Sequence, residues 1–268
     1  MRASGTGIEA EEAMATTGYV ENGGVRIYYE VHGRGVPVLL HHGFTSCAED
    51  WHRFGYVEPL AERFMVILMD ARGHGQSDKP HDPELYTMDL RTDDVRAVLD
   101  AVGVERAHYW GYSMGGLTGF YFLKRYPERV LGFVNGASGT GFPRRDLAAA
   151  QARADALASG DLKAIAATWN STESAMAALL ERNDLQALAA CMRGNLASER
   201  VDPADLQAPS LHYVGERDPI LPGTKAAAEK MAGSFHVIAG ENHLSCFRHS
   251  GKVLPLVVEF LERVSQPA

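Results

Sequence analysis

A serine in a glycine-rich setting is the residue of this chain best placed to do chemistry. Ser113 lies in the run Gly111-Tyr112-Ser113-Met114-Gly115, which has the spacing G-x-S-x-G, and Gly116 and Gly119 follow. Glycine inside a helix is unfavourable by about 1 kcal/mol relative to alanine, so this many glycines indicate a close backbone approach. A short apolar stretch precedes the run and a helical pattern follows it. The pattern predicts a sharp strand-to-helix turn that exposes Ser113 as a nucleophile.

A serine hydroxyl needs a base within hydrogen-bond reach, and the base needs an acid that orients it. Among the eleven histidines, His243 lies in a predicted loop after the last apolar stretch. His249 is a weaker alternative, because it falls where the last helix begins. Asp218 is the predicted acid, and Glu216 is the alternative but lies nearer its strand. The chain order serine, aspartate, histidine is the order that this turn architecture requires.

An acyl-transfer reaction develops an oxyanion, which needs two backbone N–H groups. The residue after the nucleophile, Met114, is one predicted donor. The other comes from the loop His41-His42-Gly43-Phe44-Thr45, where Phe44 is the best candidate and Gly43 permits a close approach.

The elements that must position these residues follow an alternating pattern. A hairpin signal, Glu21-Asn22-Gly23-Gly24, separates two strand-like segments at 18–20 and 25–31. Short apolar runs suited to buried strands then recur at 36–40, 64–69, 107–110, 130–134, 211–214 and 235–238. Helical patterns lie between them at 87–101, 114–126, 225–231 and 253–264. We therefore predict an α/β fold with a doubly wound, mostly parallel sheet.

The interval from about Phe142 to Ser198 breaks the alternation, because it is alanine-rich and helical throughout. Apolar residues recur there at the spacing of an amphipathic helix. We predict a small helical cap at 140–204, inserted into a core of 17–139 and 205–268. Trp169, Met176 and Met192 are candidate substrate-binding residues, although internal cap packing explains them equally well.

Composition argues against a nucleic-acid-binding, a secreted or a membrane-spanning protein. The net charge is −8 and the sequence pI is near 5.8, and no run of Lys or Arg suggests a nucleic-acid surface. Cys47, Cys191 and Cys246 are far apart and form no Cys-x-x-Cys site, which favours reduced thiols in a cytoplasmic protein. Residues 1–16 have no apolar segment typical of a secretory signal, and we expect a disordered extension there. No apolar run is long enough to span a bilayer, so we expect no membrane partner.

Histidines near the predicted turns raise the possibility of a metal site. His41, His42 and His74 lack ligand spacing with a nearby carboxylate, so the sequence predicts no metal and no cofactor.

With these motifs in place, the chain resembles the α/β-hydrolase fold superfamily, in its capped branch of serine esterases, lactonases and carbon–carbon hydrolases. The resemblance runs from about Gly18 to Val264. Besides the serine turn, it rests on His42-Gly43-Phe44, Gly215–Asp218, Asn242-His243 and Asp70–Asp78, which is similar to the family's D-x-R-G-x-G-x-S segment. That last segment implies a structural brace. These motifs are more specific for the fold than for a substrate. Haloalkane dehalogenases and epoxide hydrolases of this fold use an aspartate where this chain has Ser113, which argues against both activities.

The leading functional hypothesis is hydrolysis of a small-molecule carboxylic ester or lactone through an acyl-enzyme. One alternative is carbon–carbon bond hydrolysis of a dienoic ketone, which would need cations such as Arg144, Arg145 or Arg193 near the pocket. A second, from another class, is a ligand receptor on the same fold. The sequence leaves open the substrate, the acyl-chain length and the choice between monomer and dimer.

Overall fold

The computed structural model describes residues 15–140, 147–196 and 198–266. Within these residues, eight strands form one sheet in the order β1-β2-β4-β3-β5-β6-β7-β8. The pairs β1–β2 and β2–β4 are antiparallel, and the remaining neighbours are parallel. The strands are β1 (Thr16–Asn22), β2 (Val25–His32), β3 (Val36–His41), β4 (Phe64–Met69), β5 (Ala107–Tyr112), β6 (Val130–Gly136), β7 (Ser210–Gly215) and β8 (Ser234–Ile238). The predicted doubly wound, mostly parallel sheet is confirmed.

Helices connect most of the strands. They are α1 (Ala48–Arg53), α2 (Val57–Ala61), α3 (Met88–Ala101), α4 (Met114–Arg125), α5 (Leu147–Ser159), α6 (Leu162–Thr168), α7 (Glu173–Leu180), α8 (Leu185–Leu196), α9 (Leu221–Lys230), α10 (His243–Arg248) and α11 (Ser250–Ser265). Short 3₁₀ helices span Pro83–Tyr86, Pro127–Arg129 and Pro203–Asp205. The hairpin between β1 and β2 turns at Gly23 and Gly24, whose φ angles are 60° and 77°. A type I′ turn, which matches the twist of a tight hairpin, needs a positive φ at both central residues, and this explains the two glycines.

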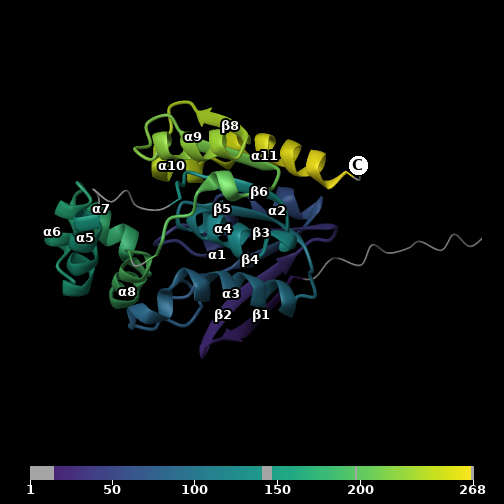
Figure 1. Cartoon of the computed structure of the whole chain (residues 1–268). Coiled ribbons are helices and arrows are strands. Elements are labelled where there is room, and N and C mark those ends of the chain that lie inside the picture. Colours follow the sequence, from purple (N-terminus) through teal and green to yellow (C-terminus); the bar gives the residue numbers. More distant parts are fainter. Residues whose placement is uncertain (1–14, 141–146, 197, 267–268) are drawn as a thin grey trace, which may run out of the picture.

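Each face of the sheet supports its own apolar core, because successive side chains of a strand point to opposite faces. On one face, Val66 and Leu68 of β4 pack with apolar residues of α1, α2, α10 and α11. On the other face, Ile67 and Met69 of the same strand pack with residues of α3, α4 and α9. Figure 1 shows the sheet between these helical layers. Burial on both faces is why the central strands appear in the sequence as uninterrupted apolar runs.

Helices α5–α8 follow β6 and precede β7, and they gather at one end of the molecule in Figure 1. They have an apolar cluster of their own, which includes Leu157, Ile165 and Leu188. This α5–α8 segment falls inside the interval predicted as a cap. Residues 1–14, most of the predicted N-terminal extension, lie outside the described residues, and residue 16 of that range belongs to β1.

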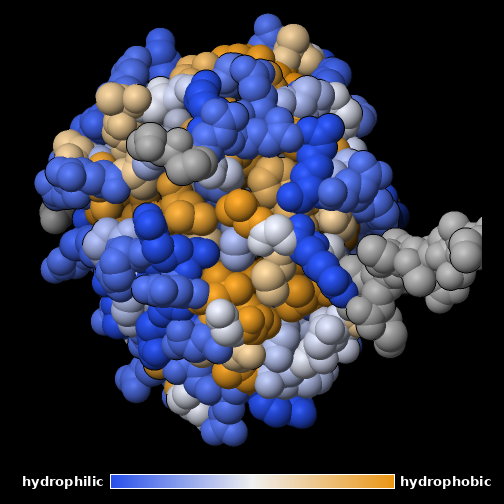
Figure 2. All heavy atoms as spheres, turned by 90° about the vertical axis from the view of Figure 1, so that its right-hand side faces the viewer, coloured by the Kyte–Doolittle hydropathy of each residue, from blue (hydrophilic) through white to orange (hydrophobic). Residues whose placement is uncertain are grey.

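The surface shown in Figure 2 is largely hydrophilic around apolar patches near its middle. Across the described ranges, no helix combines the length and apolar character that crossing a membrane requires.

Candidate active site

Ser113 occupies a strained turn between β5 and α4. Its φ and ψ angles are 52° and −108°, a region that non-glycine residues rarely adopt. The backbone N–H of Ser113 donates a hydrogen bond to the carbonyl of Gly136 at 2.7 Å, which anchors the turn to β6. Surrounding structure therefore holds the serine in a conformation that an isolated chain would avoid.

Two glycines make this turn possible through close backbone approach. A Cβ on Gly111 would overlap the backbone carbonyl of Gly115. A Cβ on Gly115 would overlap the carbonyl oxygen of His41 at the end of β3. The G-x-S-x-G spacing thus reflects steric crowding on both sides of the serine.

His243 lies between Ser113 and Asp218. Its Nε2 is 2.9 Å from Oγ of Ser113, and its Nδ1 is 2.7 Å from Oδ2 of Asp218. The Asp218 side chain is buried, and its Oδ1 accepts a hydrogen bond from the N–H of Ile220 at 2.9 Å. Because an ionised aspartate can only accept, it fixes the tautomer with the proton on Nδ1. Nε2 is then a free base directed at the serine hydroxyl.

His243 is the first residue of α10, not part of a loop as the sequence suggested. Asn242 caps this helix by accepting hydrogen bonds from the N–H groups of Leu244 and Ser245. The carbonyl of His243 accepts a hydrogen bond from Tyr112 Oη at 2.6 Å, a contact that sequence reasoning missed. The backbone of the histidine is therefore fixed from both sides.

The two alternative residues lie elsewhere. Glu216 accepts a hydrogen bond from the N–H of Gly240 at 2.8 Å and braces that loop. His249 pairs through Nδ1 with Glu241 at 2.8 Å.

The loop predicted to carry an oxyanion donor lies beside the serine. A Cβ on Gly43 would be 3.4 Å from Cβ of Ser113, which places the backbone preceding Phe44 next to the nucleophile. The N–H of Met114 is the first of α4, and such a group has no partner within its own helix. Both predicted donors therefore belong to backbone that adjoins Ser113.

Three buried histidines form hydrogen bonds in and around the loop that carries Phe44. His42 Nδ1 donates to the carbonyl of Gly43 at 2.7 Å, and its Nε2 accepts from the N–H of Ala71 at 3.0 Å. His41 and His74 use Nδ1 with Tyr109 Oη and the carbonyl of Arg72, at 2.6 and 3.1 Å. Burial lowers the pKa of all three, so they remain neutral.

The segment Asp70–Asp78 has the bracing role that the resemblance implied. Asp70 accepts hydrogen bonds from the N–H groups of Ala48 and Gln76, at 2.6 and 2.7 Å. Arg72 forms a buried two-point contact with Asp94, at 2.6 and 2.7 Å.

The α5–α8 segment contacts the same region of the core. The amide of Asn183 donates to the carbonyl of Thr45 at 3.1 Å, and Sγ of Cys191 is 3.9 Å from Sδ of Met114. Phe44 packs against the apolar cluster of this segment. That cluster also contains the three candidate substrate-binding residues, Trp169, Met176 and Met192. Trp169 additionally lies under the guanidinium of Arg153, 5.6 Å from its ring centroid.

The three cysteines are free. Burial raises the pKa of Cys47 to about 11 and that of Cys246 to about 12, so both are protonated at neutral pH. Because the thiolate is the reactive form, neither has the setting of a nucleophile.

Comparisons with known proteins indicate the same fold. A family model described as the alpha/beta hydrolase fold matches residues 36–157. A putative carbamate hydrolase of Azorhizobium caulinodans is 42% identical over 130 residues, 47% of this chain and 48% of the relative. A bifunctional esterase/perhydrolase of Acinetobacter calcoaceticus is 40% identical over 114 residues, 41% of this chain and 40% of the relative. The matches thus span about half or less of these relatives' lengths.

Solved structures match over nearly the whole chain. An N-acyl homoserine lactone degrading enzyme is 28% identical with a TM-score of 0.74, over 91% of this chain and 100% of that one. An enol-lactonase from Burkholderia xenovorans is 21% identical with a TM-score of 0.79, again over 91% and 100%. The sheet order, the family match and the likeness to these structures together show that the chain has the α/β-hydrolase fold.

Proposed function

We propose that this protein is a serine hydrolase that cleaves a carboxylic ester or lactone of a small molecule through an acyl-enzyme. The observation that carries the proposal is the continuous hydrogen-bonded chain from Asp218 through His243 to Ser113, with N···O distances of 2.7 and 2.9 Å. The named esterase and lactonase activities of the similar proteins support the same reaction class.

In this mechanism, His243 Nε2 takes the proton of Ser113 as Oγ attacks the substrate carbonyl. The N–H groups of Met114 and Phe44 stabilise the oxyanion that forms. The imidazolium returns its proton to the leaving alcohol oxygen, and the acyl-enzyme remains. His243 then removes a proton from water, which attacks the acyl carbon and releases the acid and Ser113. Asp218 stabilises the imidazolium in both halves of the reaction.

We further propose that residues 140–204 act as a cap that selects the substrate. The support is the contact of the α5–α8 segment with Thr45 and with Phe44 and Met114, the two proposed oxyanion donors. Trp169, Met176 and Met192 then shape the acyl pocket indirectly, through Phe44. Carbon–carbon hydrolysis of a dienoate, which would need cations near the pocket, has less support. Arg193 pairs with Asp155 at 2.9 Å, and Arg144 and Arg145 lie outside the described residues.

The test compares wild type, Ser113→Ala and Ser174→Ala, the last a matched control at an exposed serine of α7. Each is assayed with short and long acyl aryl esters, lactones and a coloured dienoate. We expect Ser113→Ala to lose at least about 1,000-fold in kcat/KM with an unchanged melting temperature, and Ser174→Ala to match wild type. A fluorophosphonate should label Ser113 alone.

Retention of more than about a thousandth of the activity in Ser113→Ala would exclude it as the nucleophile. Turnover of the dienoate but not of esters would replace the ester reaction with carbon–carbon cleavage. Absence of turnover with every substrate, together with a ligand-dependent protein complex, would favour the receptor.

A further inference from the structure

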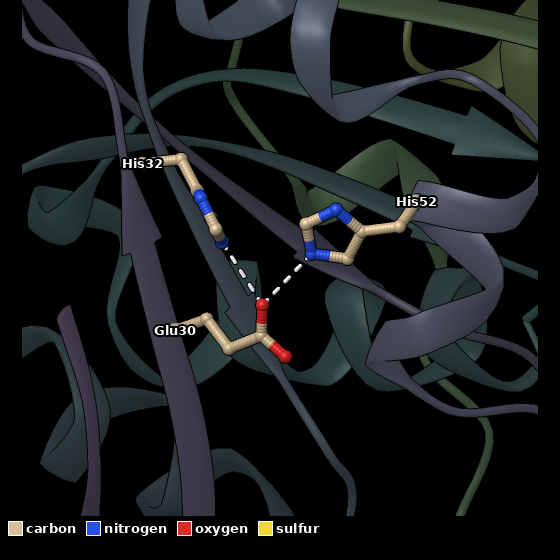
Figure 3. Close-up of side chains that lie close together, drawn as sticks. All are labelled: Glu30, His32 and His52. Atoms are coloured by element: carbon tan, nitrogen blue, oxygen red, sulfur yellow. Dashed lines mark hydrogen bonds and ion pairs between the residues drawn. The ribbon is translucent and has the colours of Figure 1, made fainter. Parts of the chain in front are cut away.

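A cluster of two histidines and a glutamate lies on the antiparallel side of the sheet, apart from the proposed triad. Glu30 and His32 are two residues apart on β2 and therefore share a face, and His52 reaches them from α1. The Nε2 atoms of His32 and His52 lie 2.9 and 2.8 Å from the same oxygen, Oε2 of Glu30. Figure 3 shows both imidazoles directed at this oxygen.

The donor set matches that of a transition metal ion. Two imidazole nitrogens and one carboxylate oxygen are the three protein ligands of several zinc sites, which keep a further position for water. One ligand atom from each residue lies within 4.8 Å of the others. Zinc bonds of about 2.0–2.1 Å at the tetrahedral angle separate two ligand atoms by about 3.3 Å. The N···O distances therefore need to open by only about 0.5 Å to admit the ion.

The surroundings hold the ligands in place. Tyr28 Oη donates to the other oxygen of Glu30, Oε1, at 3.2 Å, which leaves Oε2 for the histidines. The second ring nitrogen of His52, Nδ1, lies 3.9 Å from a carboxylate oxygen of Glu58. Metal-binding histidines commonly donate this second N–H to a carboxylate, and Glu58 would have to move closer to accept it.

The cluster is accessible to solvent. The three side chains are between 13% and 30% exposed, so an ion can enter. Glu30 also lines a cavity of about 220 Å³ together with Cys47, Asp70 and Arg182.

We propose that Glu30, His32 and His52 bind one divalent transition metal ion, with Zn²⁺ the best fit. Binding requires the proton of each neutral imidazole to move from Nε2 to Nδ1, because a ligating nitrogen must offer a lone pair. The ion ties the end of β2 to α1, the helix that directly follows the loop carrying Phe44. Its role is structural and does not depend on the hydrolase proposal.

The test titrates metal-free protein with Zn²⁺ by calorimetry and with Co²⁺ by visible absorption. We expect one tight equivalent, a Co²⁺ spectrum typical of four or five ligands, and a higher melting temperature with Zn²⁺. Substituting either histidine, as His32→Gln or His52→Gln, should weaken binding by at least about 100-fold and remove the thermal shift.

Matched controls are His81→Gln and His249→Gln, at exposed histidines that each face a single carboxylate, Asp184 and Glu241. Both should bind as wild type does. His243→Gln should also retain the equivalent, which separates this site from metal capture by the triad. Melting curves without metal show whether each variant folds. If one of His32→Gln and His52→Gln does not fold, the other still tests the site.

Absence of a stoichiometric equivalent in wild type would overturn the proposal. So would an equivalent that survives in His32→Gln and His52→Gln or disappears in His243→Gln.

Discussion

Histidine meets carboxylate in two contrasting regions of this molecule. In the triad, His243 faces Asp218 at 2.7 Å and has its second nitrogen directed at a serine hydroxyl. At the other side of the sheet, His32 and His52 both face Glu30, at 2.9 and 2.8 Å. Distances and partner types are nearly the same, yet we propose that one arrangement supplies a base to a nucleophile and the other a set of metal ligands.

The contrast teaches that the carboxylate–histidine contact does not by itself define a catalytic group. The third partner decides: a strained serine turn in one region, and a second imidazole in the other. Backbone geometry creates this difference. Ser113 has a φ of 52°, whereas Glu30 and His32 lie on a regular strand. Variants that change one carboxylate at a time therefore measure how far the two regions differ in their effect on turnover and stability.

The largest effect is expected from Asp218→Asn. An asparagine can offer an N–H to Nδ1, which favours the wrong tautomer and leaves the imidazolium without its counter-charge. We expect kcat for an aryl ester to fall by about 10⁴-fold, with the melting temperature measured alongside. The matched change Glu216→Gln, on the same loop, should leave kcat within about threefold. A loss below tenfold in Asp218→Asn would remove this residue from the triad.

A smaller effect, on stability and not on turnover, is expected from Glu30→Gln. The amide oxygen can still accept one hydrogen bond, but charge assistance for two imidazoles is lost. We expect metal-free protein to lose about 1–2 kcal/mol of unfolding free energy while ester turnover stays within about threefold. Urea unfolding and the same ester assay measure the two quantities. A fall in kcat comparable with that of Asp218→Asn would show that the two regions are coupled.

Much of the fold followed from local sequence patterns. Buried parallel strands leave uninterrupted apolar runs, so β4 was predicted with its observed ends, Phe64 and Met69. Helices α1 and α2 were not predicted, because they have only 6 and 5 residues and show too little of a helical period. His243 was placed in a loop for a similar reason, since α10 is a 6-residue helix.

The contact of Ser113, His243 and Asp218 could be predicted because the fold imposes a chain order and loop positions on these residues. The Glu30 cluster could not be predicted, since its third member depends on where α1 packs against β2. Only Glu30 and His32, two residues apart where the strand predicted at 25–31 ends, could have signalled it. Tyr112 was missed because its partner is a backbone carbonyl 131 residues away, which carries no side-chain signature.

A histidine without a carboxylate partner provides a third case beside the two regions compared above. His212 is buried on β7, where its ring nitrogens face Asn135 and Ser210, both at 3.1 Å. Burial lowers its pKa from 6.5 to about 4, because no negative charge offsets the lost hydration of the imidazolium. Between these pH values the unfolded chain binds a proton that the folded chain does not. The contribution of neutral His212 to the unfolding free energy is therefore fully present above about pH 6.5, and it declines as the pH falls toward 4.

A non-titrating variant, His212→Gln, isolates this contribution. Wild type should lose about 2 kcal/mol more unfolding free energy between pH 7 and pH 5 than the variant does, as measured by urea unfolding at both pH values. The comparison uses differences within each protein, so a general destabilisation by the substitution cancels. Equal losses in the two proteins would mean that His212 keeps its proton when folded, and burial alone would then not separate it from the histidines that face a carboxylate.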